Sequence, residues 1–88
     1  MRYTSKNLIV SEHALERFRY RVGNGTEECI KNMMLSELNK STYHGRRKGN
    51  EMRLSNGLIY ICKNLQGRTS RFSIVVTVLY DGAEKMAI

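Results

Sequence analysis

In the first forty residues, a short apolar run is followed by apolar side chains at helical spacing. Leu8-Ile9-Val10 predicts a strand or an apolar lead-in. Ser11 is a good helix N-cap, and Glu12 stands in the first turn, where the helix dipole favours an acid. The helix should run to about Val22 and stop at Gly23, because glycine tolerates the positive φ common just past a helix end. Its apolar face consists of Ala14, Leu15, Phe18 and Val22.

A second helix is expected after a short loop. Thr26 or Gly25 can cap it, and two glutamates occupy its first turn. The polar, glycine-containing stretch Lys40–Asn50 then predicts a loop. The buried stripe of the second helix is expected at Ile30, Met33, Met34 and Leu38.

The remainder of the chain predicts strands. Glu51–Leu54 is a short strand, and Asn56-Gly57 is the strongest signal for a tight hairpin in the chain. Leu58–Leu65 returns as a strand, and Arg71–Tyr80, rich in β-branched residues, forms a long one. A turn at Asp81-Gly82 leads into a tail that is a candidate for a further short strand.

This order, β-α-α-β-β-β, predicts an α+β fold in which two N-terminal helices pack on one face of an antiparallel sheet. The length of 88 residues suits a single domain spanning residues 1–88. The predicted core includes Leu15, Phe18, Ile30, Met34 and Val76.

Positive charge is concentrated in two stretches of the chain. The formal net charge is +7, and residues 40–53 hold five basic residues against one acidic, while residues 63–71 hold three basic residues and no acidic one. Such clustering is typical of a surface that binds phosphates, although a solvated, solubilising surface is the alternative. The residues assigned to nucleic-acid binding are Arg21, His44, Arg46, Arg47, Lys48, Arg53, Arg68 and Arg71.

Several other classes of protein are disfavoured. Cys29 and Cys62 lie among apolar neighbours and predict free buried thiols, not a disulfide framework or a C-x-x-C metal site. Two histidines without a carboxylate cluster argue against a catalytic metal site, and no cofactor motif is present. The N-terminal segment lacks the apolar stretch of a signal peptide, and no window approaches the ~20 apolar residues of a membrane span. We therefore expect a cytoplasmic protein with no membrane partner.

One polar stripe of the first helix carries candidate chemistry. On a helical wheel His13, Arg17, Tyr20 and Arg21 share one side, opposite Leu15. An imidazole can move a proton near neutral pH, and guanidinium groups can stabilise charge on phosphoryl oxygens. The stripe therefore suits work on a phosphodiester, and the alternative is an ordinary solvent-exposed helix face.

The predicted sheet adds polar groups at unusual places. Thr77 interrupts an apolar run, and Tyr80 ends the same strand, where it can present a phenol to a site or cap the core. Tyr60 alternates with apolar neighbours and can either stack on a base or pack across strands. His44 in the basic stretch is a second imidazole within reach of phosphate.

The segment Ser11–Phe18 with Arg21, which reads S-E-H-A-L-E-R-F-x-x-R, resembles the "HAxER…R" first-helix motif of small toxin-like domains. These domains belong to the metal-independent endoribonuclease group that includes RelE, BrnT and the nuclease domain of colicin D. The closing run Val76–Tyr80 is similar to the last core strand of that group. The architectural similarity covers nearly the whole chain, and the motifs cover about a dozen residues.

The resemblance implies a mechanism and a site. Cleavage in that group proceeds by attack of the ribose 2′-hydroxyl on the adjacent phosphate, without a metal ion. By position, His13 would transfer the proton and Arg17 would hold the phosphate, with Thr77 and Tyr80 completing the catalytic site from the sheet.

Three functional hypotheses follow. The leading one is a toxin-type endoribonuclease that acts on RNA and is either held in check by an antitoxin or confined to a particular moment of expression. The second is a non-catalytic nucleic-acid-binding or inhibitor protein, of a kind that phages carry, which blocks a host protein through its basic surface. The third is an interaction module whose positive face meets an acidic protein. A chain this short, with a thin stability margin, is also a candidate homodimer.

Overall fold

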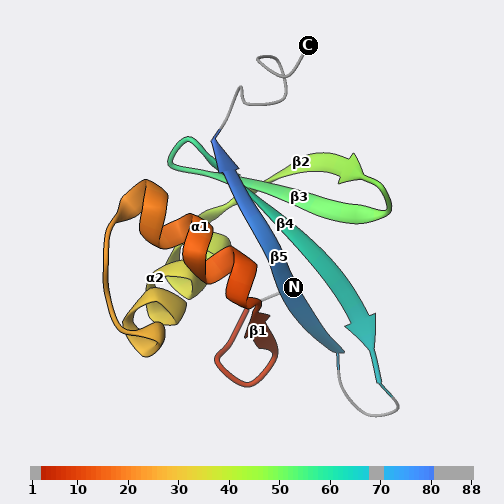
Figure 1. Ribbon diagram of the computed structural model, residues 1–88. Helices are drawn as coiled ribbons and strands as arrows, with labels where there is room; N and C mark the ends of the chain where they lie inside the picture. Colours follow the sequence, from red (N-terminus) through yellow and green to blue (C-terminus); the bar gives the residue numbers. More distant parts are fainter. Residues whose placement is uncertain (1–2, 68–70, 81–88) are drawn as a thin grey trace.

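The computed structural model describes residues 3–67 and 71–80, which form two helices and a five-stranded mixed sheet (Figure 1). The strands lie in the order β1-β5-β4-β3-β2 across the sheet. This is an α+β fold, as predicted. The elements are β1 (Leu8–Val10), α1 (Glu12–Val22), α2 (Glu27–Lys40), β2 (Thr42–Arg47), β3 (Asn50–Ser55), β4 (Leu58–Gln66) and β5 (Arg71–Tyr80).

The predicted helix ends are confirmed. The Ser11 hydroxyl accepts a hydrogen bond from the Ala14 N–H at the start of α1, and the helix ends at Gly23, which has a φ of 141°. Thr26, not Gly25, caps α2 through its hydroxyl. Local hydrogen bonding therefore marks both helix starts.

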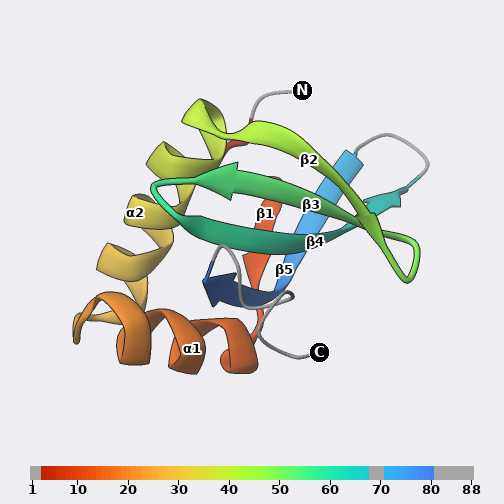
Figure 2. The same ribbon diagram turned by 90° about the horizontal axis from the view of Figure 1, so that it is seen from above.

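The main core lies between the two helices and one face of the sheet (Figure 2). Leu15, Phe18, Ile30 and Met34 are buried there, as predicted. Val22 and Met33 were expected in the same stripes, but both side chains are 47% exposed. Val22 stands in the last turn of α1, and Met33 is rotated about 100° from the buried Met34. The sheet contributes Leu58, Tyr60, Cys62, Val75 and Val78 to this core.

The stretch predicted as a loop contains an additional strand, so the expected element order was wrong at this point. Strand β2 pairs antiparallel with β3, and the two are joined by a tight turn in which Lys48 and Gly49 have φ values of 52° and 85°. An edge strand that exposes charged side chains needs no apolar alternation, which is why the pattern missed it. The hairpin predicted at Asn56-Gly57 is confirmed, with φ values of 50° and 75° for these two residues.

The sheet is mixed, not antiparallel as expected, because β1 pairs parallel with β5. A strand of only three residues does not reveal in the sequence whether it pairs parallel or antiparallel. Both helices and strands β2 to β4 lie between β1 and β5, and this long connection allows the two strands to run in the same direction. The expected strand after residue 80 lies outside the described residues. No helix in the described part of the chain has the length and apolar character required to cross a bilayer.

Neither of the two described helices covers the second face of the sheet, which holds a smaller apolar cluster; we call it the open face. Met52, Ile59 and Ile61 are buried in this cluster. Val76, predicted for the main core, is only partly buried and belongs to this second cluster with Leu79. The fold thus leaves one surface of the sheet available beside the start of α1.

Candidate active site

A β-bulge in β5 turns Thr77 onto the open face. Ile61 and Cys62 are consecutive in β4, but their partners in β5 are Thr77 and Val75, so Val76 is the extra residue. Strict alternation would place Thr77 on the same face as Val75, which is fully buried in the core beneath the helices. The bulge shifts the alternation of side chains by one residue. Thr77 therefore pairs with Ile61 and lies on the open face with it.

The first turn of α1 is tied to this bulge through Ser11. Its N–H donates to the Val75 carbonyl oxygen at 3.1 Å, and its hydroxyl donates to the Val76 carbonyl oxygen at 2.9 Å. The same hydroxyl accepts from the Ala14 N–H at 3.0 Å. His13 stands two residues after this contact, so the start of α1 and the bulge hold its backbone beside the open face.

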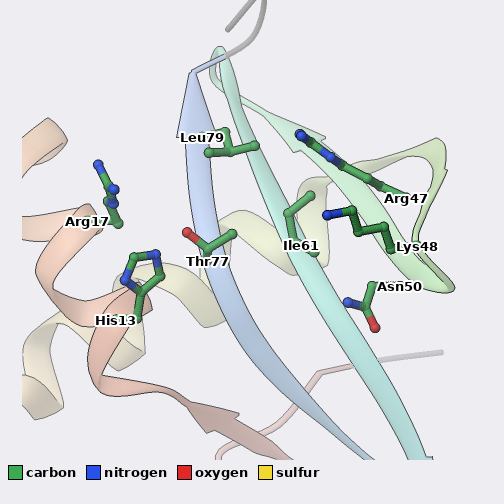
Figure 3. Close-up of a pocket in the computed structure, with 8 residues that line it drawn as sticks. All are labelled: His13, Arg17, Arg47, Lys48, Asn50, Ile61, Thr77 and Leu79. Carbon is green, nitrogen blue, oxygen red and sulfur yellow. The ribbon is translucent and has the colours of Figure 1, made fainter. Parts of the chain in front are cut away.

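A hollow of about 290 Å³ lies between α1 and the turn of the β2–β3 hairpin; we call it the central hollow (Figure 3). His13 and Arg17 project into it from α1 on one side, and hairpin side chains project from the other side. Strands β4 and β5 form its floor. Its lining residues are His13, Arg17, Arg47, Lys48, Asn50, Ile61, Thr77 and Leu79.

The Thr77 hydroxyl lies at the floor of this hollow without a hydrogen-bond partner in the described part of the chain. Its Oγ1 atom is buried and forms no hydrogen bond within the described residues. Buried polar groups are nearly always hydrogen-bonded in proteins, and one without a partner requires an explanation. In Figure 3 the oxygen is directed to the side from which His13 approaches. Thr77 lines the hollow, and its hydroxyl can act as a hydrogen-bond donor or acceptor that no described protein atom satisfies.

The charge of the central hollow suits an anion. Arg17 on one side and Arg47 and Lys48 on the other contribute three cationic side chains, and no carboxylate within residues 3–67 and 71–80 belongs to the lining. The tight turn fixes the backbone of Lys48 in the left-handed region, which sets the direction of its side chain over the floor. A phosphate group is the common biological anion that uses several cations and a hydroxyl together.

Tyr80 and Arg21, both predicted for the site, lie away from the hollow and contact each other. The Arg21 guanidinium carbon lies 4.3 Å from the centre of the Tyr80 ring, and its Nε donates to the Val78 carbonyl oxygen at 3.1 Å. Tyr80 shares a face of β5 with the buried Val78, because two residues along a strand point to the same side. This pair joins the last turn of α1 to the end of β5.

Arg53, also predicted to bind nucleic acid, lies on the helix-covered side and belongs to a polar network. Its guanidinium donates to the Ser41 hydroxyl at 3.0 Å and pairs with the Glu51 carboxylate at 2.9 Å. Partial burial would raise the pKa of Glu51. The hydrogen bonds from Asn64 and Arg53 and the positive charges of Arg53 and Arg46 outweigh that effect and hold the pKa below its ordinary value.

The other predicted basic residues are spread over the surface. His44 is exposed at the irregularity in β2 and does not line the central hollow. Arg46 donates to the Gly49 carbonyl oxygen at 3.3 Å and faces a neighbouring hollow. Arg71 is exposed at the first residue of β5, at the opposite end of the strand from Tyr80. Arg68 lies outside the described residues.

The structure thus brings together His13, Arg17, Thr77, Arg47 and Lys48 from the predicted set and separates the others from them. Three lining residues were not foreseen: Asn50, Ile61 and Leu79. Ile61 and Leu79 form an apolar floor, and their alternation along β4 and β5 is the only signal that could have suggested it. No group of three or more metal-ligating side chains occurs in residues 3–67 and 71–80.

Comparison of the chain with protein-family models, with curated proteins and with solved structures gives no match.

Proposed function

We propose that the protein is an endoribonuclease that cleaves by attack of a ribose 2′-hydroxyl on the adjacent phosphate in the central hollow, without requiring a metal ion. One observation carries the proposal. An imidazole, an unpartnered threonine hydroxyl and three cationic side chains from opposite walls converge on one hollow. Three of these residues, His13, Arg17 and Thr77, also belong to the motifs that resemble toxin-type endoribonucleases.

In the proposed reaction, α1 and the β2–β3 hairpin, which form opposite sides of the central hollow, supply residues with different roles. The attacking 2′-oxygen and the departing 5′-oxygen lie on opposite sides of phosphorus in an in-line displacement. His13 takes the proton of the 2′-hydroxyl as the new bond to phosphorus forms. As the bond to the 5′-oxygen breaks, the Lys48 ammonium on the facing wall supplies the proton to the leaving oxygen. The products are a 2′,3′-cyclic phosphate and a 5′-hydroxyl.

The guanidinium groups have an electrostatic role in this proposal. Negative charge grows on the non-bridging phosphoryl oxygens as the nucleophile adds, and Arg17 and Arg47 lie on the two sides of the hollow where they can stabilise it. The Thr77 hydroxyl donates to one of these oxygens from the floor. Such preorganised donors are effective because they need no rearrangement during the reaction.

Incubation of the purified protein with RNA in the presence of EDTA tests the proposal, since EDTA suppresses metal-dependent contaminants. Cleavage should give 2′,3′-cyclic phosphate ends, and a substrate with deoxyribose at the cleaved position should resist because it lacks the nucleophile. His13→Ala should lower the rate about 10²–10⁴-fold, as expected for loss of positioned acid–base catalysis. His44→Ala is the matched control, because that imidazole lies outside the hollow. Equal cleavage of the deoxyribose substrate would refute the 2′-hydroxyl mechanism.

A second candidate function is binding of nucleic acid without cleavage. It is favoured by one feature of the central hollow, whose lining includes neither a carboxylate nor a second imidazole of the described residues. In this case the same hollow would hold a backbone phosphate through Arg17, Arg47 and Lys48. Tight binding of RNA that is never cut, with loss of binding in Arg17→Ala, would select this function over the first.

A further inference from the structure

Two more hollows adjoin the central hollow and share residues with it. One, of about 250 Å³, is lined by His13, Glu16, Arg17 and Tyr20. The other, of about 670 Å³, lies on the far side of the hairpin turn and includes Lys48, Asn50 and Lys63 in its lining. His13 and Arg17 belong to both the first and the central hollow, and Lys48 and Asn50 belong to both the central hollow and the second. The three hollows are therefore contiguous.

The hollow beside α1 has the character of a base-binding site. Tyr20 is 86% exposed, more than any other large hydrophobic side chain within the described residues, and it lies about one helical turn beyond Arg17. An exposed aromatic ring next to a phosphate site offers a face on which an unpaired base can stack. The carboxylate of Glu16 in the same lining disfavours a phosphate there but can accept a hydrogen bond from a base amino group.

The hollow beyond the hairpin has the opposite character. Its lining holds three cationic side chains, Arg46, Lys48 and Lys63, together with the amide of Asn50, and no carboxylate of the described residues belongs to it. The amide of Asn64 also lines this hollow, but it donates to the Glu51 carboxylate. Lys63 is exposed on β4 in register with Ile74 and is two residues from Ile61, so it shares the open face with the central hollow. Cations and amide donors without an acid suit a backbone phosphate.

We infer that two nucleotide subsites flank the central hollow: a base-stacking subsite at Tyr20 and a phosphate subsite at Lys63. This inference deepens the proposed function and rests on it for the identity of the ligand as RNA. The ligand segment is single-stranded, because a base paired in a duplex is stacked between its neighbours and cannot lie on Tyr20. Tyr20 and Lys63 position the strand and take no part in the bond changes.

Binding of a 2′-O-methyl RNA hexamer tests both subsites without cleavage, since the blocked 2′-oxygen cannot act as nucleophile. Tyr20→Ala should weaken binding about 5- to 100-fold, the range typical of one lost base–aromatic stack, while Tyr20→Phe should retain affinity. Tyr43→Ala is the matched control, because Tyr43 is 59% exposed on β2 in register with Arg53, on the other face of the sheet. Removing one base at a time from the hexamer should reveal a position whose loss has no effect in Tyr20→Ala.

Lys63→Ala should reduce the slope of log affinity against log salt by about 0.7, the value for one neutralised phosphate on a single strand. Lys40→Ala, at the end of α2, serves as its control and should leave the slope unchanged. Unchanged affinity in Tyr20→Ala, or equal sensitivity of a duplex, would overturn the stacking subsite. Equal slopes for Lys63→Ala and Lys40→Ala would overturn the phosphate subsite.

The outcomes separate this inference from the proposed function. If the variants behave as expected but the wild-type protein never cleaves RNA, the subsites stand and the ribonuclease proposal falls. If the protein cleaves RNA and the variants neither bind nor cleave differently, the ribonuclease proposal stands and the subsites fall.

Discussion

The Ser11 hydroxyl donates a 2.9 Å hydrogen bond to the carbonyl oxygen of Val76, the extra residue of the bulge in β5. The Ser11 hydroxyl oxygen also accepts a hydrogen bond from the Ala14 N–H and so caps α1. One side chain therefore couples the start of the helix that carries His13 to the bulge that places Thr77 on the open face. The relative position of these two site residues depends on this contact.

The first prediction tests that coupling with Ser11→Ala. Loss of the cap should lower the free energy of unfolding by about 0.5–2 kcal/mol. The cleavage rate should fall by a larger factor than the folded fraction, because the start of α1, which carries His13, loses the Ser11 side-chain hydrogen bond to the bulge. Thr26→Ala is the control, since Thr26 caps α2 without any bond to the sheet that the structure records. It should cost similar stability, measured by denaturant unfolding, and leave the rate per folded molecule unchanged. Equal rate losses in both variants would contradict the coupling.

The second prediction concerns the Thr77 hydroxyl. Thr77→Val removes a buried polar atom that has no partner in the described structure, while preserving the shape of the side chain. The free energy of unfolding should therefore stay constant or rise, because no hydrogen bond is lost and a desolvated polar group is removed. Cleavage or RNA affinity should fall, and Thr77→Ser should retain most of both. A destabilised Thr77→Val with full activity would show that the hydroxyl serves the fold instead.

The third prediction concerns the hairpin turn. We replace Arg47 and Lys48 together by alanine. The slope of log RNA affinity against log salt should then be reduced by about 0.7 for each phosphate that is no longer neutralised. The fold should remain intact, because both side chains are exposed on an edge hairpin. Arg71→Ala, at the far end of β5, provides the comparison and should change the slope less. Binding that is indifferent to salt in the wild-type protein would exclude a phosphate ligand.

The fourth prediction concerns the two thiols. Burial raises the pKa of Cys62 to about 12, with a further contribution from the negative charge of Glu51. Cys29, which was also predicted to be buried, is exposed, so that prediction was wrong. At pH 8 a disulfide reagent should therefore titrate one thiol in the native protein and two after unfolding, because only the thiolate reacts. The raised pKa also means that Cys62 contributes stability below the ordinary thiol pKa of about 8.5, which is lost progressively as pH rises toward 12. Two reactive thiols in the native protein would contradict the burial of Cys62.

Local signals in the sequence were sufficient for both helices and one hairpin. Ser11, Gly23 and Thr26 act through bonds to their near neighbours, and Asn56-Gly57 adopts positive φ values that few other residue pairs accept. Such features depend on residues a few positions apart, so the pattern along the chain contains them. The apolar stripes identified most of the helical core for the same reason.

The arrangement of the site required long-range information. The pattern did not reveal β2, the parallel pairing of β1 or the bulge at Val76, because each arises from hydrogen bonds between separate segments of the chain. Arg53 and Arg47 are indistinguishable as basic residues in sequence, yet one lies in a network on the helix-covered side and the other lines the central hollow. The sequence by itself determined the charge, the two helices and the residue types available for chemistry. Only the tertiary structure decided which of them meet, because the face on which a strand residue lies depends on pairing and on bulges, not on its own identity.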